Sequence, residues 1–518
     1  MAIKKLRTTL LVIVDGWGVG NSEEPGNPIT PKSAPNYFSF LKKYPNCQLE
    51  ASGLSVGLFK GQEGNSEAGH LNLGAGRVVK QDALYISDSI ADGTFFKNSV
   101  FQQAISQVKK YKSSVHLMGL LSNHNSAHSC PEHAYALLDL LHRENIEKVY
   151  LHLFTDGRDS GQFEAHKHLR LLKKFFHGNE KVATVMGRFY AMDRNKNWER
   201  TGAAYKAMVL GQGQKFASAE EALRNSYNSE ETDEFLQPSV ITEKGRPVAT
   251  IKENDALIFF NLRSDRARQL TKAFVQPNFK EVNPGAFNRT KQIKNLNFVA
   301  LTDFGPDLPG VVSAFPSRDV KKSLVQVLCP RKQLYLAESE KFAHVTYFLN
   351  GGYAQHFCDE NWVKIDSDDV KNYASKPEMS AERLTDYVIN AIESGNYEFI
   401  AMNFANMDMV GHTGNFAAAQ KAVSAVDAAL GRIVKALLKN QGQGIITADH
   451  GNIEVMINPE SGEPDTEHST NPVPFILINS WIKTPDKLPD GKLANVAPTV
   501  LKMMGVDKPV EMTAKSLI

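Results

Sequence analysis

The sequence predicts an α/β protein built on a mostly parallel sheet, and two observations carry that prediction. Short runs rich in Val, Ile and Phe recur without polar alternation, as in strands that are buried on both faces of a parallel sheet. These runs lie at 9–15, 115–120, 149–156, 181–187, 256–261, 297–303, 399–404 and 444–452. Segments with helical periodicity lie between them, and such alternation is typical of helices packed on a parallel sheet.

The first run resembles a secretory signal, because basic residues precede the apolar stretch from Leu10 to Val14. Asp15 ends that stretch after too few residues for a signal core, and no small-residue cleavage pattern follows. We therefore expect a buried strand here. No stretch approaches the ~20 apolar residues that a membrane-spanning helix needs, so no membrane partner is expected.

The clearest helical pattern covers 415–440. Its apolar positions step by four and three and form one stripe: Ala419, Val423, Val426, Leu430, Ile433 and Leu437. Asn415 can cap the start, and Gly442 lies just beyond the end. A second helix is expected from Pro131, since proline suits the first helical turn.

The length and charge of the chain limit its organisation and its partners. A chain of 518 residues favours two or more cores. Lys and Arg total 59 against 57 Asp and Glu, and this balance favours neither a nucleic acid nor a membrane as partner. The four cysteines, Cys47, Cys130, Cys329 and Cys358, form no C-x-x-C pair. Their spacing gives no disulfide framework, and reduced thiols in a cytoplasmic protein are expected.

Aspartates and histidines gather after the predicted strands, where ligands collect in open α/β sheets. Asp15 follows the first run; Asp408 and His412 follow 399–404; Asp449 and His450 follow the run that begins at 444; His468 precedes a further apolar segment. An isolated Asp or His in such a loop is usually a turn or cap residue. Two Asp/His pairs, each flanked by glycine, favour a metal site, and mixed carboxylate and imidazole ligands suit Mn²⁺ or Zn²⁺ better than Ca²⁺.

Ser66, in the glycine-rich stretch 61–70, is a candidate nucleophile. The local sequence GNSEAG is not a G-x-S-x-G elbow, because Ala68 stands at the last glycine position. A divalent metal ion is another way to activate a hydroxyl at neutral pH. The chain has neither a P-loop nor a G-x-G-x-x-G in strand–helix context, so nucleotide binding is not expected.

The middle of the chain is rich in arginines that follow apolar runs. Arginine binds carboxylate and phosphate oxygens two at a time, which favours a small, multiply anionic ligand. Surface salt bridges are the alternative, and this alternative is strong for Arg200 and Arg268. The candidate binding residues are Arg158, Arg188, Arg194, Arg263 and Arg266, with Asp159 and His128 nearby in the sequence. Lys341, after a strand-like segment, could hold a phosphate or neutralise a helix end.

Taken together, these stretches closely resemble the cofactor-independent phosphoglycerate mutases of the alkaline phosphatase superfamily. The matching motifs span nearly the whole chain in the family's order: VDGWG, GNSEAGHLNLGAGR, FTDGRD, GRFYAMDRNKNWER, RSDRARQL, EKFAHVTYFLNGG, NMDMVGHTGN, TADHGN and EHSTNPVPF. The resemblance implies a phosphatase-like metal-binding domain (1–80 and 312–518) interrupted by an inserted substrate-binding transferase domain (81–311).

The resemblance also implies a set of site residues. One Mn²⁺ or Mg²⁺ ion would be held by Asp15, Ser66, Asp449 and His450, and a second by Asp408, His412 and His468. Ser66 would become phosphoserine, and Lys341 would stabilise the phosphoryl group. The substrate would be bound by His128, Arg158, Asp159, Arg188, Arg194, Arg263 and Arg266, with Asp159 as the candidate general base.

The expected reaction is the interconversion of 3-phosphoglycerate and 2-phosphoglycerate without bisphosphoglycerate, by a monomer in the cytoplasm. Two alternatives use the same residues. A phosphatase or phosphopentomutase would share the metal scaffold, whereas a non-catalytic binding protein would use its metals structurally and would not be phosphorylated on Ser66.

Overall fold

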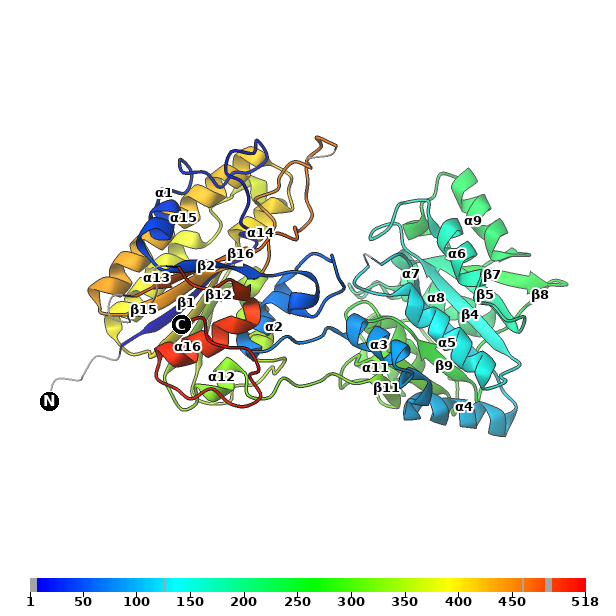
Figure 1. Ribbon diagram of the computed structural model, residues 1–518. Helices are drawn as coiled ribbons and strands as arrows, with labels where there is room; N and C mark the ends of the chain where they lie inside the picture. Colours follow the sequence, from blue (N-terminus) through cyan, green and yellow to red (C-terminus); the bar gives the residue numbers. More distant parts are fainter. Residues whose placement is uncertain (1–6, 125, 459–460, 480–486) are drawn as a thin grey trace. The chain divides into compact units, whose positions relative to one another are not determined.

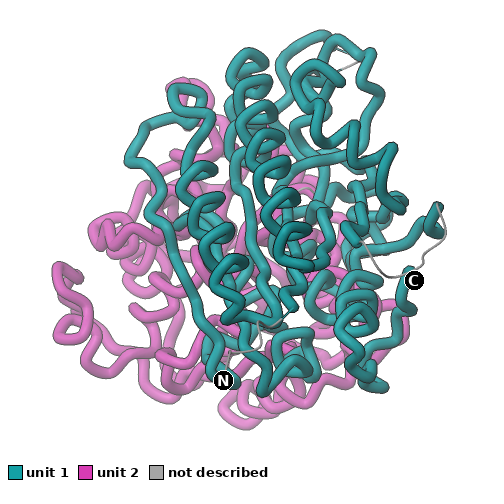
Figure 2. The backbone as a smooth tube through the Cα atoms, turned by 90° about the vertical axis from the view of Figure 1, so that its left-hand side faces the viewer, with its two compact units in different colours: residues 1–81, 319–518 teal, residues 82–318 magenta. Residues whose placement is uncertain are grey.

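The computed structural model describes residues 7–124, 126–458, 461–479 and 487–518. The chain divides into two compact units (Figure 2): unit 1 consists of residues 1–81 and 319–518, and unit 2 of residues 82–318. The chain passes from one unit to the other after Gln81 and after Arg318. The second boundary expected from the sequence, between 311 and 312, lies inside strand β11 (Val311–Phe315), which belongs to unit 2 because it pairs with β10 (Asn297–Thr302).

Unit 1 contains a mixed sheet whose core is parallel. Its described strands follow the order β13 (Asn361–Ile365), β12 (Gln333–Glu338), β14 (Phe399–Phe404), β1 (Thr9–Val14), β15 (Gln443–Thr447), β16 (Val473–Ile478), β2 (Asn46–Glu50) and β17 (Gly491–Lys492). β16 is antiparallel to both β15 and β2, and the other pairings are parallel. β1 is fully buried between β14 and β15, as its uninterrupted apolar run predicts.

Helices cover both faces of this sheet. In Figure 1, α13 and α15 lie on one side and α12 and α16 on the other. The helices of unit 1 are α1 (Pro35–Lys43), α2 (Ser66–Ala75), α12 (Leu324–Val327), α13 (Ala381–Ser394), α14 (Asn406–Gly411), α15 (Phe416–Lys439) and α16 (Val496–Met503). The predicted apolar stripe of α15 is buried, and the Asn415 side chain caps its start.

Unit 2 contains a second sheet with the order β11, β10, β9 (Ala256–Phe259), β3 (Val115–Leu121), β4 (Val149–Thr155), β5 (Glu180–Gly187), β7 (Ser239–Glu243) and β6 (Gln214–Phe216), with β8 (Arg246–Pro247) on β7. β7 is antiparallel to β5 and to β8. Its helices are α3 (Asp82–Ala91), α4 (Ser99–Tyr111), α5 (Pro131–Arg143), α6 (Ala165–Lys173), α7 (Arg188–Ala191), α8 (Trp198–Leu210), α9 (Ala219–Asn228), α10 (Arg268–Val275) and α11 (Phe279–Val282).

These two sheets confirm the predicted α/β fold with two domains. Every apolar run used for the prediction contains a strand within one or two residues of the expected start. The antiparallel strand β16 has no distinguishing sequence pattern, since its buried apolar run is as continuous as those of the parallel strands. Among the helices of the described ranges, none is long and apolar enough to cross a membrane.

The cysteines correct one prediction. Cys329 and Cys358 form a disulfide with a Cα–Cα distance of 5.9 Å, so the expectation that all four thiols are reduced is wrong for this pair. The partners lie 29 residues apart, and the segment after α12 and the loop before β13 bring them together. Spacing alone could not reveal a pairing that depends on tertiary structure. Cys47 and Cys130 are free and buried.

A buried carboxylate joins α1 to α15 and leads to a stability prediction. Ala34, at the start of α1, has no side-chain oxygen for capping. Asp427 of α15 accepts instead from Asn36 N at 3.0 Å and Tyr37 N at 2.8 Å. Asp427→Ala should therefore lower the free energy of unfolding by about 1–3 kcal/mol, because buried N–H groups lose their acceptor. Urea denaturation followed by circular dichroism measures this loss.

Asp427→Asn is the matched control, because its amide oxygen still accepts one of the two bonds. We expect its unfolding free energy to lie between those of the wild type and the alanine variant. An alanine variant as stable as the wild type would show that Asp427 does not stabilise α1.

Candidate active site

The predicted metal ligands of unit 1 meet at one edge of its sheet. Asp15, Asp408 and Asp449 follow the carboxyl ends of β1, β14 and β15, three strands that run parallel side by side. His468 precedes β16, and the antiparallel direction of β16 brings its start to the same edge. Ser66 follows β2, which runs parallel to β15 because two antiparallel pairings separate them.

Ser66 lies at the first turn of α2, where its neighbours hold it in place. The side chain of Asn65 caps the helix by accepting from Ala68 N at 2.9 Å. Ser66 Oγ lies 3.2 Å from Asp15 Oδ1 and 3.0 Å from Nε2 of His450. Because Ser66 is only 7% exposed, its hydroxyl reacts in surroundings set by these charged groups rather than by bulk water.

Lys341 connects Ser66 to two of the buried aspartates. Its Nζ donates to Ser66 Oγ at 2.6 Å, to Asp15 Oδ1 at 2.7 Å and to Asp408 Oδ2 at 2.6 Å. Burial alone would lower the pKa of this ammonium, but the carboxylates of Asp15 and Asp408 outweigh burial and hold the pKa well above its ordinary value. Lys341 is therefore a permanent cation beside the candidate nucleophile.

The other carboxylate oxygen of Asp408 contacts two histidines. Oδ1 lies 3.0 Å from His468 Nε2 and 3.2 Å from His412 Nε2, and these two nitrogens are 3.1 Å apart. Burial raises the pKa of Asp408, but Lys341, followed by hydrogen bonds from both histidines, holds it well below its ordinary range. An ionised carboxylate with two converging imidazole nitrogens is a typical donor set for a divalent metal ion.

The second group contains Asp15, Asp449 and His450, all fully buried. His450 Nε2 lies 3.5 Å from both Asp15 Oδ1 and Asp449 Oδ2. Burial would lower the pKa of His450, but Asp449, with Asp15 and Asp408, raises it to about 9. This histidine is therefore protonated at neutral pH until a cation replaces its proton.

The residues of both groups fit divalent cations. Asp449 Oδ2 is buried without a hydrogen-bond partner. His70 Nδ1 lies 3.1 Å from this oxygen, but it donates its hydrogen bond to the Ser66 carbonyl at 2.9 Å instead. A buried carboxylate oxygen without a hydrogen-bond donor is energetically costly, and a bound cation would remove that cost. Two sets of three donors in this site have their ligand atoms within 4.8 Å of one another: Asp408, His450 and His468, and Asp15, His70 and Asp449. His450 therefore lies close to ligands of both predicted groups.

Four residues of this site were missed by the sequence reasoning: His70, Asn403, Asn452 and Glu454. Asn403 donates to Asp15 Oδ2 at 2.8 Å and contacts His70 Nε2 at 3.0 Å. Glu454 accepts from Asn452 N at 2.9 Å, and Asn452 Nδ2 donates to Asp408 Oδ1 at 3.2 Å. His70 could have been found, since it lies one helical turn after Ser66. Asn403 lies inside the buried strand β14, and the only sequence feature that distinguishes it is that it is a polar residue in an apolar run.

A second cluster in unit 2 gathers predicted residues at the carboxyl ends of β4 and β5. Arg188 Nη1 contacts Asp156 Oδ1 at 2.5 Å and Asp159 Oδ2 at 2.9 Å. Ser126 Oγ donates to the same Asp159 oxygen at 2.7 Å. Burial alone would raise the pKa of Asp159, but Arg188 and the Ser126 hydrogen bond hold it below its ordinary value. Asp159 is thus ionised at neutral pH.

Asp265, which no sequence pattern distinguishes, lies near three further basic residues. It accepts from Arg194 Nη1 at 2.7 Å, and it lies 3.9 Å from Arg263 Nε and 4.0 Å from His128 Nδ1. Burial, then the positive charge of Arg188, lowers the pKa of His128 to about 4, so this imidazole is neutral at pH 7.

The last two predicted residues of unit 2, Arg266 and Arg158, have other partners. Arg266 donates to the Met192 carbonyl at 3.3 Å. Arg158 lies 3.6 Å from Glu234 and keeps about half of its side chain exposed. The structure therefore brings the predicted residues of unit 2 to one strand edge, with Arg158 the least constrained among them.

Two family models together match most of the chain. The model described as the BPG-independent PGAM N-terminus matches residues 86–306, which lie in unit 2. The model described as type I phosphodiesterase / nucleotide pyrophosphatase matches residues 320–489, which lie in unit 1.

Full-length relatives are also similar to this chain. A 2,3-bisphosphoglycerate-independent phosphoglycerate mutase 1 of Methanosarcina acetivorans is 49% identical over 99% of this chain and 98% of its own length. A 2,3-bisphosphoglycerate-independent phosphoglycerate mutase of Moorella thermoacetica is 47% identical over 100% and 99%. Among solved structures, a Leishmania mexicana phosphoglycerate mutase at low cobalt concentration matches with a TM-score of 0.76 and 29% identity, over 99% of this chain and 97% of that one.

Proposed function

The chain belongs to the family of 2,3-bisphosphoglycerate-independent phosphoglycerate mutases, and from that membership we propose which of its residues carry the reaction. The protein is an isomerase that interconverts 3-phosphoglycerate and 2-phosphoglycerate through a phosphoserine. We assign the phosphoserine to Ser66. The observation that supports this assignment is the buried contact of Ser66 Oγ with Lys341 Nζ at 2.6 Å and His450 Nε2 at 3.0 Å.

The family uses divalent metal ions, and we propose two ligand sets for a pair of Mn²⁺ or Mg²⁺ ions. Asp15, Ser66, Asp449 and His450 would hold one ion, and Asp408, His412 and His468 the other. Metal ions bound there would lower the pKa of the Ser66 hydroxyl and offset charge on the transferring phosphoryl group. The mixed carboxylate and imidazole donors favour Mn²⁺ over Mg²⁺.

The residues of unit 1 have different roles in the proposed reaction. The negative carboxylates of Asp15 and Asp408 hold Lys341 charged, and its ammonium donates hydrogen bonds toward the Ser66 oxygen as that oxygen gains the phosphoryl group. Asn403 fixes the orientation of Asp15, and Asn452 fixes that of Asp408. Fixed donors of this kind stabilise developing charge without reorganising during the reaction.

Metal affinity should depend on pH through His450. The pKa of His450 is raised to about 9 in the protein without metal, so a proton must leave before Nε2 can bind an ion. Below that pKa, each pH unit gained should strengthen Mn²⁺ binding about tenfold for one released proton. Titration calorimetry between about pH 7 and about pH 8 measures this slope. An affinity that does not change over this range would contradict a metal-ligating role of His450.

In unit 2 we propose that the arginines bind the carboxylate and phosphate oxygens of the substrate. Arg188, Arg194, Arg263, Arg266 and Arg158 supply the guanidinium groups, and His128, neutral at pH 7, supplies a hydrogen bond. Asp159 is the proposed general base for the glycerate hydroxyls. It is ionised and held by Arg188 and Ser126, so it is ready to accept a proton, although its low pKa makes it a weak base.

The variant Asp159→Asn tests this assignment. It keeps the shape of the side chain and removes the proton acceptor, so kcat should fall about 10²- to 10³-fold while the metal content stays unchanged. Glu243→Gln, at an exposed carboxylate of β7, is the matched control and should retain full activity. A variant with wild-type kcat would exclude Asp159 as the base.

A coupled assay tests the function itself. The purified protein is given 3-phosphoglycerate and Mn²⁺ without bisphosphoglycerate, and 2-phosphoglycerate and inorganic phosphate are measured together. We expect isomer without matching phosphate release, whereas equal release of phosphate would indicate a phosphatase. We further propose a monomer that acts in the cytoplasm, which sedimentation and cell fractionation would check.

A further inference from the structure

A group of metal-ligating side chains in unit 2 includes none of the proposed substrate residues. His124 belongs to the loop after β3, Cys130 is the residue before α5, and Glu132 lies in the first turn of α5. His124 Nε2 lies 3.2 Å from Glu132 Oε1, and Cys130 Sγ lies 3.1 Å from Glu132 Oε2. One donor atom from each of the three residues lies within 4.8 Å of the other two.

We propose that His124, Cys130 and Glu132 form a binding site for a thiophilic divalent cation of the Zn²⁺ class, separate from the catalytic metal pair. Thiolate, imidazole and carboxylate are the common zinc ligands. Bond lengths of about 2.0–2.3 Å at a tetrahedral angle place donor atoms roughly 3.5 Å apart, so small side-chain movements close this set around one ion. The thiolate selects against Mn²⁺ and Mg²⁺, which favour oxygen donors.

The surroundings of the three residues suit an open site with one fixed ligand. Cys130 is 4% exposed, whereas the side chains of His124 and Glu132 are 64% and 46% exposed, which leaves a path for an ion and a position for water. In the protein without the ion, the thiol proton lies between Sγ and Glu132. A cation would take the place of that proton, which leaves to solvent.

Two features partly offset the cost of ionising the Cys130 thiol. Cys130 lies at the N-terminal end of α5, where the helix dipole favours negative charge. Burial and the adjacent Glu132 raise the pKa of Cys130 to about 12, and the Ser87 hydroxyl opposes this rise by hydrogen bonding. Ser87 also forms a hydrogen bond with His133 Nε2 at 3.1 Å, which restrains its hydroxyl and thereby the sulfur that it contacts.

Occupancy of this site would restrain a proposed substrate loop. Ser126 and His128 lie between His124 and Cys130 in the chain, so one ion would tie both ends of the segment that carries them. Amide hydrogen exchange in residues 126–130 should therefore slow when Zn²⁺ is added.

Cobalt spectroscopy of the full-length protein tests the site. Co²⁺ bound to a thiolate gives a near-ultraviolet sulfur-to-cobalt charge-transfer band, whereas the oxygen and nitrogen ligands of unit 1 give none. We expect this band in the wild type, in the absence of thiol reductants so that the Cys329–Cys358 disulfide contributes no thiolate. Zn²⁺ should displace the band, and Mn²⁺ should not.

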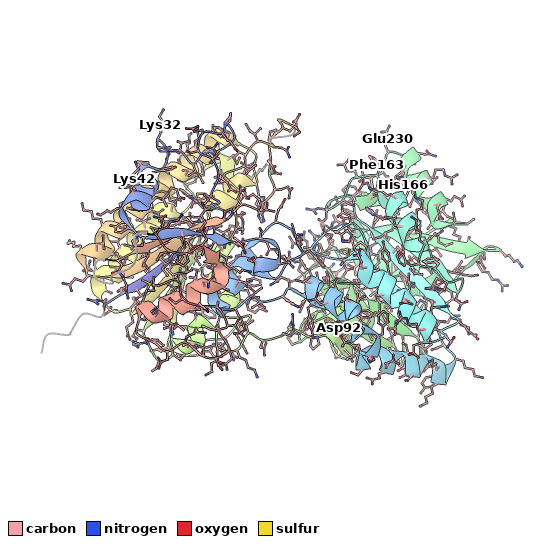
Figure 3. All side chains as sticks on the ribbon, viewed as in Figure 1. Lys32, Lys42, Asp92, Phe163, His166 and Glu230 are labelled. Carbon is pink, nitrogen blue, oxygen red and sulfur yellow. A yellow bond between two sulfur atoms is a disulfide. The ribbon has the colours of Figure 1, made fainter. Side chains whose placement is uncertain are left out.

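Variants identify the ligands. Cys130→Ser should remove the band, and His124→Ala and Glu132→Gln, both solvent-facing changes, should weaken Co²⁺ binding about tenfold to a hundredfold. His166→Ala, at an exposed histidine of α6 (Figure 3), and Cys47→Ala, at the other free cysteine, should keep the wild-type band. The absence of any band, a band that persists in Cys130→Ser, or unchanged affinity in both solvent-facing variants would overturn the proposal.

Discussion

Replacement of Ser66 by alanine is expected to lower mutase kcat by about 10⁶-fold, the order of loss that follows removal of a covalent nucleophile. The reason is specific to this site. No other hydroxyl among the described residues contacts Lys341 Nζ, which lies 2.6 Å from Ser66 Oγ. The alanine variant should still bind metal, since Asp15, Asp449 and His450 remain.

Two measurements and one control make this prediction specific. The coupled mutase assay gives kcat, and mass spectrometry of protein quenched during turnover should find a phosphoryl group on the peptide that contains Ser66. Ser424→Ala, at an exposed serine of α15, should leave both unchanged. Turnover by Ser66→Ala within tenfold of the wild type would eliminate Ser66 as the carrier.

Replacement of Lys341 by methionine should lower kcat by about 10³- to 10⁵-fold, comparable to the loss of a cation that stabilises a transferring phosphoryl group. Methionine matches the length of the lysine stem but donates no hydrogen bond. Without metal, the same change should destabilise the protein by about 3–5 kcal/mol, because the buried carboxylates of Asp15 and Asp408 lose the ammonium that lies between them.

The two effects of Lys341→Met can be separated by adding Mn²⁺. Metal ions should restore most of the stability, measured by thermal unfolding, because they neutralise the same carboxylates. They should not restore kcat, because the ammonium beside Ser66 is still missing. Lys332→Met, at an exposed lysine of unit 1, is the control. Recovery of activity with Mn²⁺ would reduce Lys341 to a purely structural role.

From the sequence, the polar residues at the sheet edge of unit 1 could be selected, but their arrangement around one another could not be predicted. Asp15, Asp408 and Asp449 could be selected because each follows a buried apolar run, and parallel strands end at a common edge. Which of the aspartates lie close to His450 could not be deduced, because these contacts of 3–4 Å depend on side-chain orientations. His468 posed a different difficulty: it reaches the site only because β16 runs antiparallel, and its apolar run does not reveal direction.

In unit 2 the sequence predicted the arginines but not what holds them. Arg188 and Arg194 stood out as basic residues near strand ends. Their partners Asp156 and Asp265 were not selected, because an acidic residue near an arginine is common on any protein surface. The disulfide between Cys329 and Cys358 was missed for a related reason, since no local pattern encodes a contact between distant loops.

The discontinuity of unit 1 has a consequence for the order in which the protein matures. β1 and Ser66 leave the ribosome before unit 2 does, but the neighbours that β1 needs, β14 and β15, begin more than 380 residues after β1. Unit 2, formed by one uninterrupted segment, can fold while translation continues. A chain synthesised only as far as the end of unit 2 thus carries an alcohol without its activating groups, and catalytic competence arises only after β14 and β15 have followed.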